Sequence, residues 1–341
     1  MNNKLKYAAL LSAVLLPVSL VGCQSQSINN STPQTATLQQ TPEVRMMAHL
    51  KALQSIAQKH EGHRAVATAG GLATAQYIRD YAKQKGLTAQ LIPFENSKKK
   101  VGHNVIVEIK GQSIDKAIII GAHYDSVDQG PGINDNGSGV AVVLELMDYY
   151  AQTTPKQTMY FAFWDSEEEG IAGSKAFVDK MSAKQLQGIS AYINVDMVGT
   201  KTPTIMLVDS TKSSVDEMEQ LLKQQNMKPE DYQPLIESLR AVPTHAGDTK
   251  LENYLTQFFK ARSYPVRKDV STLLASDTLP FLGKVPVASL VFFNEQMKGN
   301  VLEFAPCYHQ ACDTLEGIEP KSLNLAIDAI QGLVQHIQTT P

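Results

Sequence analysis

Apolar positions along the chain follow two kinds of spacing, which predict helices and strands. Residues 45–60 and 72–86 repeat apolar side chains at the spacing of an amphipathic helix. Residues 88–95 and 101–111 alternate apolar and polar positions, as a strand with one solvated face does. Residues 116–123 form an apolar run typical of a strand buried on both faces. The first third of the chain therefore contains both element types.

Helices and strands continue to alternate through the rest of the chain. Helices are predicted over residues 138–152, 171–181, 213–225, 251–260 and 321–338, and buried strands over Met159–Trp164, Tyr192–Val195 and residues 285–294. Alternation of this kind favours an α/β fold with a mixed, mostly parallel central sheet, an antiparallel edge and helices on both faces. No internal repeat or heptad pattern interrupts it.

The N-terminus has the pattern of an export signal. Basic residues precede an apolar stretch that is interrupted by Pro17 and is too short for a comfortable membrane span. The stretch ends in "LVGC", which resembles the lipobox of bacterial lipoproteins, so residues 1–23 are expected to be a signal peptide and Cys23 to be lipidated. An ordinary secretory signal with a chance cysteine is the alternative. In an organism with two membranes, resemblance to known lipoprotein sorting rules means that Gln24 after the cysteine favours the outer membrane, facing the periplasm or the cell surface.

Composition separates a tether from the folded part of the chain. Residues 24–43 are rich in Gln, Ser, Thr and Asn, as flexible linkers are, and one domain is expected over 44–341. With 43% hydrophobic residues, 19% charged residues and a net charge of -3, the chain gives no electrostatic case for binding nucleic acid. The lysine run at 98–100 is interpreted as a solvated hairpin tip.

Two further cysteines, Cys307 and Cys312, lie in "CYHQACDT" on either side of His309. Exported proteins meet an oxidising compartment, and a lipidated Cys23 would leave these two as a natural pair. A structural zinc site would need about four ligands, and the neighbouring residues supply too few. A disulfide is therefore favoured over free thiols.

Potential metal ligands follow the buried strands at their carboxyl ends. His123 and Asp135 come after the first strand, and Glu167 and Glu168 after the second. Asp196 ends the third strand. Ligand sites in open α/β sheets form at this edge, so we expect these side chains, together with His309, to meet there.

Histidine with aspartate and glutamate is a donor set suited to zinc, or to cobalt or manganese. A pair of metals needs one bridging carboxylate, plus one carboxylate and one histidine for each ion. This assignment uses Asp135, His123, Asp196, Glu168 and His309. Glu167 is left without a ligand role, and a metal-assisted hydrolase needs such a group to move a proton.

The motifs "GAHYDSV", "GINDNGSGVAVVLE", "SEEEGIAGS", "INVDMVG" and "CYHQACDT" together resemble metallopeptidase family 28, the co-catalytic di-zinc aminopeptidases of the bacterial leucyl aminopeptidase type. The resemblance covers roughly residues 70–320 and implies the zinc-dependent exopeptidase fold. By position it implies that Asp135 bridges two zinc ions, with Glu168 and His309 on one and His123 and Asp196 on the other.

The resemblance also assigns the remaining residues of these motifs. It implies that Glu167 is the general base and that Asp125 receives the N–H of His123. Tyr308 stands where some members use a tyrosine hydroxyl to stabilise the oxyanion. Some members have a cis peptide after the bridging aspartate, so the Asp135–Asn136 bond is expected to be cis.

Three points of the motif pattern stay open at this level. In "SEEEG", base and ligand fall on Glu167 and Glu168 unless the register is shifted by one towards Glu169. In "SDTLPF", Thr278 replaces the histidine that the family often has, so the segment is either a helix cap or a part of the pocket. Residues 209–262, where the resemblance thins, are expected to be a variable insertion near the substrate pocket.

These observations predict a metal-dependent exopeptidase that removes N-terminal, apolar residues from peptides with metal-activated water. Its partners would be peptides with a free N-terminus, and the membrane through a lipid anchor. A carboxypeptidase of the same family is the hardest alternative to exclude. A single-zinc glutaminyl cyclase or a non-catalytic binding protein is disfavoured because all the ligand residues and the base are present.

Overall fold

The computed structural model describes residues 41–298 and 301–339. The signal peptide, Cys23 and residues 24–40 of the tether lie outside these residues. The first helix, α1, begins at Pro42, with the side chain of Thr41 accepting the N–H of Val44. The folded domain therefore begins two residues before the position expected from composition.

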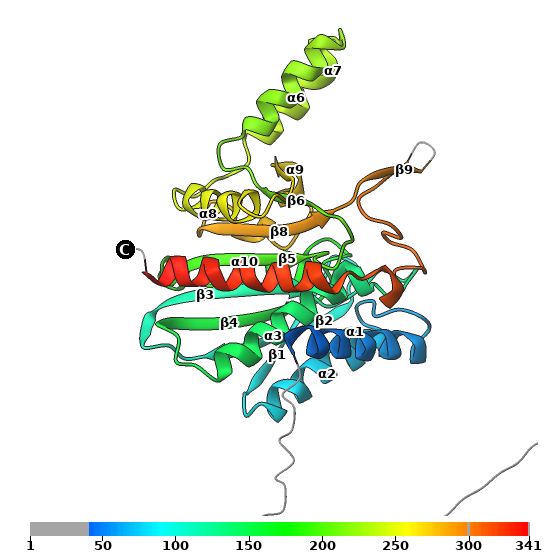
Figure 1. Ribbon diagram of the computed structural model, residues 1–341, viewed down its shortest axis with the longest axis vertical. Coiled ribbons are helices and arrows are strands. Elements are labelled where there is room, and N and C mark those ends of the chain that lie inside the picture. Colours follow the sequence, from blue (N-terminus) through cyan, green and yellow to red (C-terminus); the bar gives the residue numbers. More distant parts are fainter. Residues whose placement is uncertain (1–40, 299–300, 340–341) are drawn as a thin grey trace, which may run out of the picture. The chain divides into compact units, whose positions relative to one another are not determined.

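A sheet of eight strands forms the centre of the domain, in the order β1-β2-β4-β3-β5-β8-β6-β7 (Figure 1). The strands of this sheet are β1 (Ala89–Glu95), β2 (Val101–Ile109), β3 (Ser113–His123), β4 (Gln157–Trp164), β5 (Ile189–Asp196), β6 (Thr204–Val208), β7 (Val266–Asp269) and β8 (Val287–Phe293). Strands β4, β3, β5 and β8 run parallel to one another, and β1, β2 and β6 pair antiparallel. The prediction of a mixed, mostly parallel sheet is confirmed.

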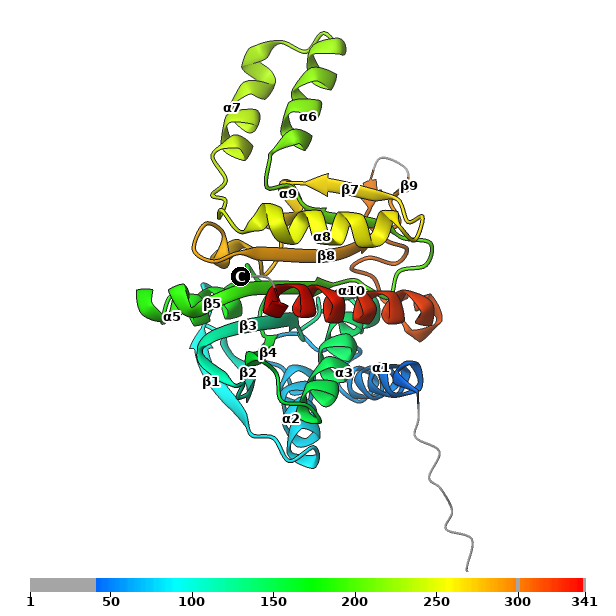
Figure 2. The ribbon, with the colours of Figure 1, turned by 60° about the vertical axis from the view of Figure 1, so that its left-hand side comes forward.

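Helices cover both faces of the sheet. The helices are α1 (Pro42–Lys59), α2 (Ala69–Gln84), α3 (Gly139–Ala151), α4 (Ala172–Val178), α5 (Ala183–Gly188), α6 (Ser213–Gln224), α7 (Pro229–Arg240), α8 (Asp248–Lys260), α9 (Ser271–Leu274) and α10 (Pro320–Thr339). Helices α1, α2, α3, α8 and α10 pack on one face, and Figure 2 shows α8 and α10 lying along it. Helices α4, α6 and α7 contribute to the core on the other face.

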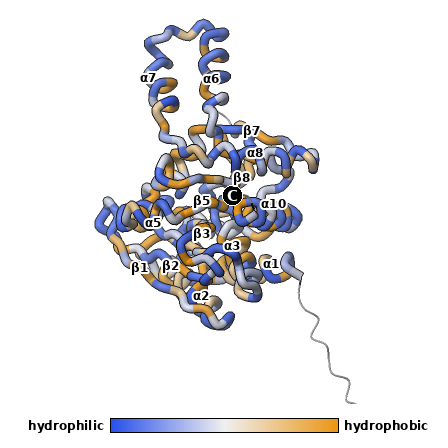
Figure 3. Tube along the Cα trace, turned by 90° about the vertical axis from the view of Figure 1, so that its left-hand side faces the viewer, coloured by the Kyte–Doolittle hydropathy of each residue, from blue (hydrophilic) through white to orange (hydrophobic). Residues whose placement is uncertain are grey.

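The alternation of side chains along the strands explains why two cores form. Ile118 and Ile120 of β3 point into the core beneath α3, whereas Ile119 points into the opposite core. The hydropathy colouring of Figure 3 shows the apolar residues gathered in central strands such as β5 and β8. Such double-sided burial matches the continuous apolar runs of these strands.

The sequence pattern missed several elements between β5 and β8. Strands β6 and β7 are short, and α7 contains Pro229 and Pro234, which hid its helical spacing. Helix α8 buries Leu255 and Phe259 against the sheet, so this part of residues 209–262 belongs to the core of the domain. A small hairpin of β9 (Gln296–Lys298) and β10 (Val301–Glu303) follows β8.

Three short helical turns, η1 (Ile133–Ser138), η2 (Leu279–Phe281) and η3 (Leu315–Gly317), lie in the connections. Over the residues that the structure describes, none of the helices has the length and apolar character required to cross a bilayer.

Candidate metal centre

The carboxyl ends of three neighbouring parallel strands bring the expected residues together. Strand β3 lies between β4 and β5, and His123 is its last residue. Asp196 is the last residue of β5, and Glu167 and Glu168 follow shortly after β4 ends at Trp164. His123 is in register with Trp164, so the acids after β4 emerge beside it.

Asp135, at the centre of the cluster, faces two histidines with its two oxygens. Its Oδ1 lies 3.3 Å from Nε2 of His123, and its Oδ2 lies 3.2 Å from Nε2 of His309. Nε2 of His309 is also 3.1 Å from Oε2 of Glu168, and Nε2 of His123 is 3.7 Å from Oδ1 of Asp196. The side chains thus form two groups, each with one histidine and one carboxylate, which share Asp135.

The cluster contains buried polar atoms that the protein itself does not satisfy. Among the described residues, Oε1 of Glu168 and Oδ1 of Asp196 are buried without a hydrogen-bond partner. Burial, together with repulsion from Asp135, raises the pKa of Glu168 to about 7. Because buried carboxylates of this kind require a cation or a proton, and nitrogen and oxygen donors converge here, the residues fit a zinc-type metal. Ligand atoms of His123, Asp135 and Glu168 all lie within 4.8 Å of one another.

The backbone at Asp135 is fixed by hydrogen bonds to Asp313. The carboxylate of Asp313 accepts the N–H groups of Asn134, at 2.8 Å, and Asp135, at 3.0 Å. The Asp135–Asn136 peptide bond is cis, as expected. Gly139 begins α3 with an ordinary helical backbone; a Cβ there would lie 2.3 Å from the carbonyl oxygen of Val195. This glycine is therefore required because a side chain would collide with the backbone of β5.

Asp125 contacts both His123 and the acidic loop, which is the segment 166–170 that follows β4. Its Oδ1 lies 3.3 Å from Nδ1 of His123 and accepts the N–H of Glu167 at 3.1 Å. Its Oδ2 accepts the N–H of Glu168 at 3.3 Å. One buried carboxylate thus lies beside a histidine of the cluster and fixes the backbone of the two glutamates.

The three consecutive glutamates after β4 point to different places. Glu168 faces His309, as described above, whereas Glu169 is bound by Lys100 at 2.6 Å and by Asn96 at 2.9 Å, away from the cluster. Burial raises the pKa of Glu167 well above its usual value; His123 opposes this shift, and Asp277 adds to it. Glu167 lines the pocket without joining either histidine group, so the geometry favours the unshifted register.

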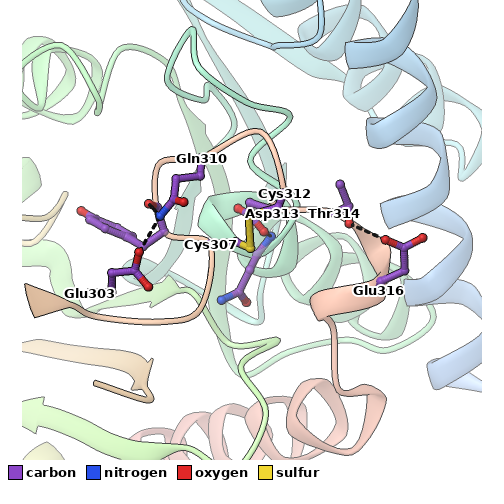
Figure 4. Close-up of a disulfide and its surroundings, with 9 residues drawn as sticks. Glu303, Cys307, Gln310, Cys312, Asp313, Thr314 and Glu316 are labelled. Atoms are coloured by element: carbon purple, nitrogen blue, oxygen red, sulfur yellow. Dashed lines mark hydrogen bonds between the residues drawn. A yellow bond between two sulfur atoms is a disulfide. The ribbon is translucent and has the colours of Figure 1, made fainter. Parts of the chain in front are cut away.

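The loop before α10 carries Tyr308 and His309 between two cysteines. Cys307 and Cys312 form the expected disulfide, shown in Figure 4, and Gln310 in the same loop donates to Glu303. The ring of Tyr308 stacks on that of His309, with centroids 3.8 Å apart. Burial, with the nearby carboxylates, raises the pKa of Tyr308 above its usual range.

A pocket of about 310 Å³ opens over the cluster. Metal-competent residues form one side, and its apolar wall is formed by Met197, Ala275, Val291, Phe293, Phe304 and Tyr308. The rest of the pocket wall is formed by residues between positions 269 and 276 and by residue 295. Among the described residues, none of those at 209–262 lines the pocket, so the expected insertion does not form its wall. Ser276 of "SDTLPF" lines the pocket, and Asp277 is buried and accepts from Ser174 at 2.5 Å. Two larger hollows, of about 690 and 770 Å³, contain none of the clustered residues.

Arg64 supports the site and gave no signal in the sequence. Its guanidinium is fully buried and donates to the carbonyl oxygens of Tyr124, Pro131 and Gly132. These carbonyls belong to the loop between His123 and Asp135, so Arg64 fixes the path of that loop. Neither Arg64 nor Asp313 belongs to a repeating sequence pattern, so only the contacts in the structure reveal their roles.

Comparison with known proteins places these observations in a family. Residues 104–334, more than half of the chain, match the model of peptidase family M28. "Leupeptin-inactivating enzyme 1" of Streptomyces exfoliatus is 28% identical over 302 residues, which cover 85% of this chain and 60% of that protein. "Probable lipoprotein aminopeptidase LpqL" of Mycobacterium tuberculosis is 33% identical over 224 residues, covering 65% and 43%. The chain thus spans roughly half the length of these relatives.

Solved structures share the fold at low sequence identity. The zinc aminopeptidase BSAP of Bacillus subtilis superposes with a TM-score of 0.64 at 15% identity, covering 86% of this chain and 94% of that one. The glutaminyl cyclase of Porphyromonas gingivalis superposes with a TM-score of 0.62 at 16% identity, covering 86% and 98%. Since both activities occur on this fold, the fold alone does not choose between them.

Proposed function

The chain belongs to peptidase family M28, and from this premise we propose that it is an aminopeptidase that holds two zinc ions. The observation that carries the proposal is the position of Asp135, whose two oxygens face His123 and His309 separately. A single-metal site needs no carboxylate shared between two histidines. This arrangement therefore favours a metal pair over the single zinc of the cyclase alternative.

We assign the ligands according to the two groups. Asp135 would bridge the ions, Glu168 and His309 would complete one, and His123 and Asp196 the other. When bound, zinc polarises a carbonyl group and lowers the pKa of water. Asp125 keeps His123 in the orientation that presents Nε2 to the cluster.

The remaining groups of the site perform the proton transfer and the charge stabilisation. Glu167 would take a proton from the attacking water and deliver it to the leaving amine, because it lines the pocket without joining either histidine group. The hydroxyl of Tyr308, which keeps its proton at neutral pH, would donate to the developing oxyanion. Asp125 fixes the Glu167 backbone from the inner side.

The pocket supports a substrate with a free amine and an apolar side chain. Carboxylates of Glu167 and Asp196 line the pocket, and their negative charge favours a cationic amine. The adjoining wall includes Met197, Phe293 and Phe304, which would accept leucine, methionine or phenylalanine. A carboxypeptidase would instead need a cation in the pocket to bind the substrate carboxylate, and none of the lysines or arginines lines the described pocket.

We further propose that the protein is exported and anchored by lipid at Cys23, in the outer membrane. The disulfide between Cys307 and Cys312 suits an oxidising compartment, and the mycobacterial relative is described as a lipoprotein. Mass spectrometry of the native mature protein tests this: a chain that begins at Cys23 without lipid would contradict the anchor.

The experiment that tests the function joins metal content to hydrolysis of leucyl-p-nitroanilide. We expect two zinc ions per chain, loss of hydrolysis with a chelator, and recovery on adding zinc or cobalt. One ion per chain together with cyclisation of N-terminal glutamine would support the cyclase alternative. Hydrolysis that survives complete removal of metal would contradict the proposal.

A further inference from the structure

The turn between β1 and β2 contacts the acidic loop directly, although its lysines suggested a solvated hairpin tip. Asn96, at the end of β1, is 4% exposed. Its Nδ2 donates to Oε2 of Glu169 at 2.9 Å and to Oγ of Ser166 at 3.1 Å. Ser166 directly precedes Glu167, and Glu169 directly follows Glu168. A single amide group therefore bonds to both flanks of the two central glutamates.

The orientation of this amide is fixed by the turn itself. Oδ1 of Asn96 accepts the backbone N–H groups of Lys98, at 2.9 Å, and Lys100, at 3.0 Å. Because two N–H groups point at this atom, it must be the oxygen, and the nitrogen must face the acidic loop. The turn thus holds Asn96 rigidly in the orientation that reaches Ser166 and Glu169.

Charge adds to this contact. The ammonium of Lys100 lies 2.6 Å from Oε1 of Glu169, and that of Lys98 lies 3.4 Å from it. Glu169 is thereby kept away from the metal cluster, where a further carboxylate would compete with Glu168. Strand β2 also helps to hold the start of the acidic loop, since the N–H of His103 donates to Asp165, the residue before Ser166, at 2.9 Å.

We propose that Asn96 is a positioning residue for Glu167 and Glu168, acting through Ser166 and Glu169 from the outer side of the loop while Asp125 holds it from the inner side. Its catalytic consequence rests on the proposed function, but its effect on metal binding does not. Loosening the loop should displace the base and one metal ligand together, and misplaced catalytic groups lose rate steeply.

The test variant is Asn96→Asp, which keeps the acceptor for the turn and removes the donor to the loop. We expect kcat for leucyl-p-nitroanilide to fall about tenfold with KM nearly unchanged, and zinc affinity, measured by chelator competition, to fall about tenfold. The matched control is Lys99→Gln at the same turn: Lys99 pairs with exposed Glu95 at 2.8 Å and should leave both values unchanged.

The double variant Asn96→Asp/Glu169→Gln exchanges donor and acceptor. The new amide at position 169 can donate to the new carboxylate at position 96, and the Ser166 hydroxyl can donate to it as well, so we expect kcat and zinc affinity to recover. A generally damaged fold would not recover in this way. If Asn96→Asp does not fold, Glu169→Ala removes the same contact from the loop side and should lower both values.

Two results would overturn the inference. One is unchanged kcat and zinc affinity in Asn96→Asp; the other is a fall only in the unfolding temperature, which would mean a merely structural turn. A wild-type protein without peptidase activity would refute the proposed function, while the zinc affinities of the same variants would still decide the role of Asn96.

Discussion

The carboxylate of Asp313 accepts the backbone N–H of Asp135 at 3.0 Å. Asp135, which faces both histidines of the cluster, is therefore held by a residue outside the cluster. Asp313 also accepts the N–H of Asn134 at 2.8 Å. In Asp313→Asn, one acceptor oxygen becomes an NH₂ group that faces a backbone N–H. Because Asp135 is shared by both proposed ions, we expect the affinity for both to fall, by about 10- to 100-fold.

Chelator competition with zinc measures this effect. Asp328→Asn is the matched control, since Asp328 lies exposed on α10. Loss of only one ion in Asp313→Asn would contradict the shared role of Asp135.

Replacing the proposed base should separate metal binding from turnover. Glu167→Gln keeps the shape of the side chain but cannot accept a proton, so we expect kcat to fall by about 10²- to 10⁴-fold. Zinc content should stay at the wild-type value because Glu167 joins neither histidine group. Metal analysis and kinetics on the same sample test both points. Near-normal turnover would show that another group moves the proton.

A site residue could be predicted from the sequence where a local pattern, such as the end of an apolar strand, marks its position. His123 and Asp196 end strands whose apolar runs are clear in the sequence, so the sheet edge at which they meet followed from the pattern. The bridging role of Asp135 and the assignment of His309 to one of the two ions came from the family motifs, because local spacing does not distinguish these roles.

The supporting contacts could not be predicted, since they join positions far apart in the chain. Asn96 and Glu169 are 73 residues apart, and Asn134 and Asp313 are 179 apart. A polar side chain in a loop looks the same in sequence whether it is solvated or buried against a catalytic loop. The wall at residues 269–276 was missed for a similar reason, because β7 and α9 are too short to show a period.

The disulfide should stabilise the loop that carries His309. His309 is only partly buried, with 38% of its side chain exposed, so packing alone holds it weakly. In Cys307→Ser/Cys312→Ser we expect unfolding to be easier by about 2 kcal/mol, from the entropy of closing so short a loop. The affinity of the ion assigned to His309 should fall as well.

Denaturant titration and chelator competition measure the two effects, with the oxidised wild type as reference. Mass spectrometry of the unreduced wild type should find Cys307 and Cys312 linked. Two freely alkylated thiols at these positions would contradict the bridge, and unchanged metal affinity in the double serine variant would contradict its support of His309.

His49 should make the domain less stable in mild acid. Burial, with Lys85 adding to it, lowers the pKa of His49 to about 4, from about 6.5 in the unfolded chain. Because the folded pKa is the lower one, the unfolded chain binds more protons between pH 6.5 and pH 4, and stability falls as pH falls through this window. The loss from pH 7 to pH 5 should be about 2 kcal/mol.

The comparison that isolates this effect is the slope of unfolding free energy against pH for wild type and His49→Gln. Glutamine can keep a hydrogen bond to Tyr77, which lies 2.6 Å from Nδ1 of His49, but it does not titrate. The variant should show a flatter slope over this range. Equal slopes would assign the acid sensitivity to other groups.

Cleavage should require a free N-terminus, because the substrate amine is expected to lie among Glu167, Asp196 and the metals. Acetylation removes the positive charge and a charge-assisted hydrogen bond, and it blocks the metal contact; each interaction is worth about 1.5–3 kcal/mol. The combined loss corresponds to about a hundredfold or more in kcat/KM. The measurement compares leucyl-p-nitroanilide with its N-acetylated form, with a carboxypeptidase substrate alongside. Equal cleavage of the acetylated compound, or cleavage of the carboxyl-terminal substrate alone, would reject the aminopeptidase assignment while leaving the metal ligands in place.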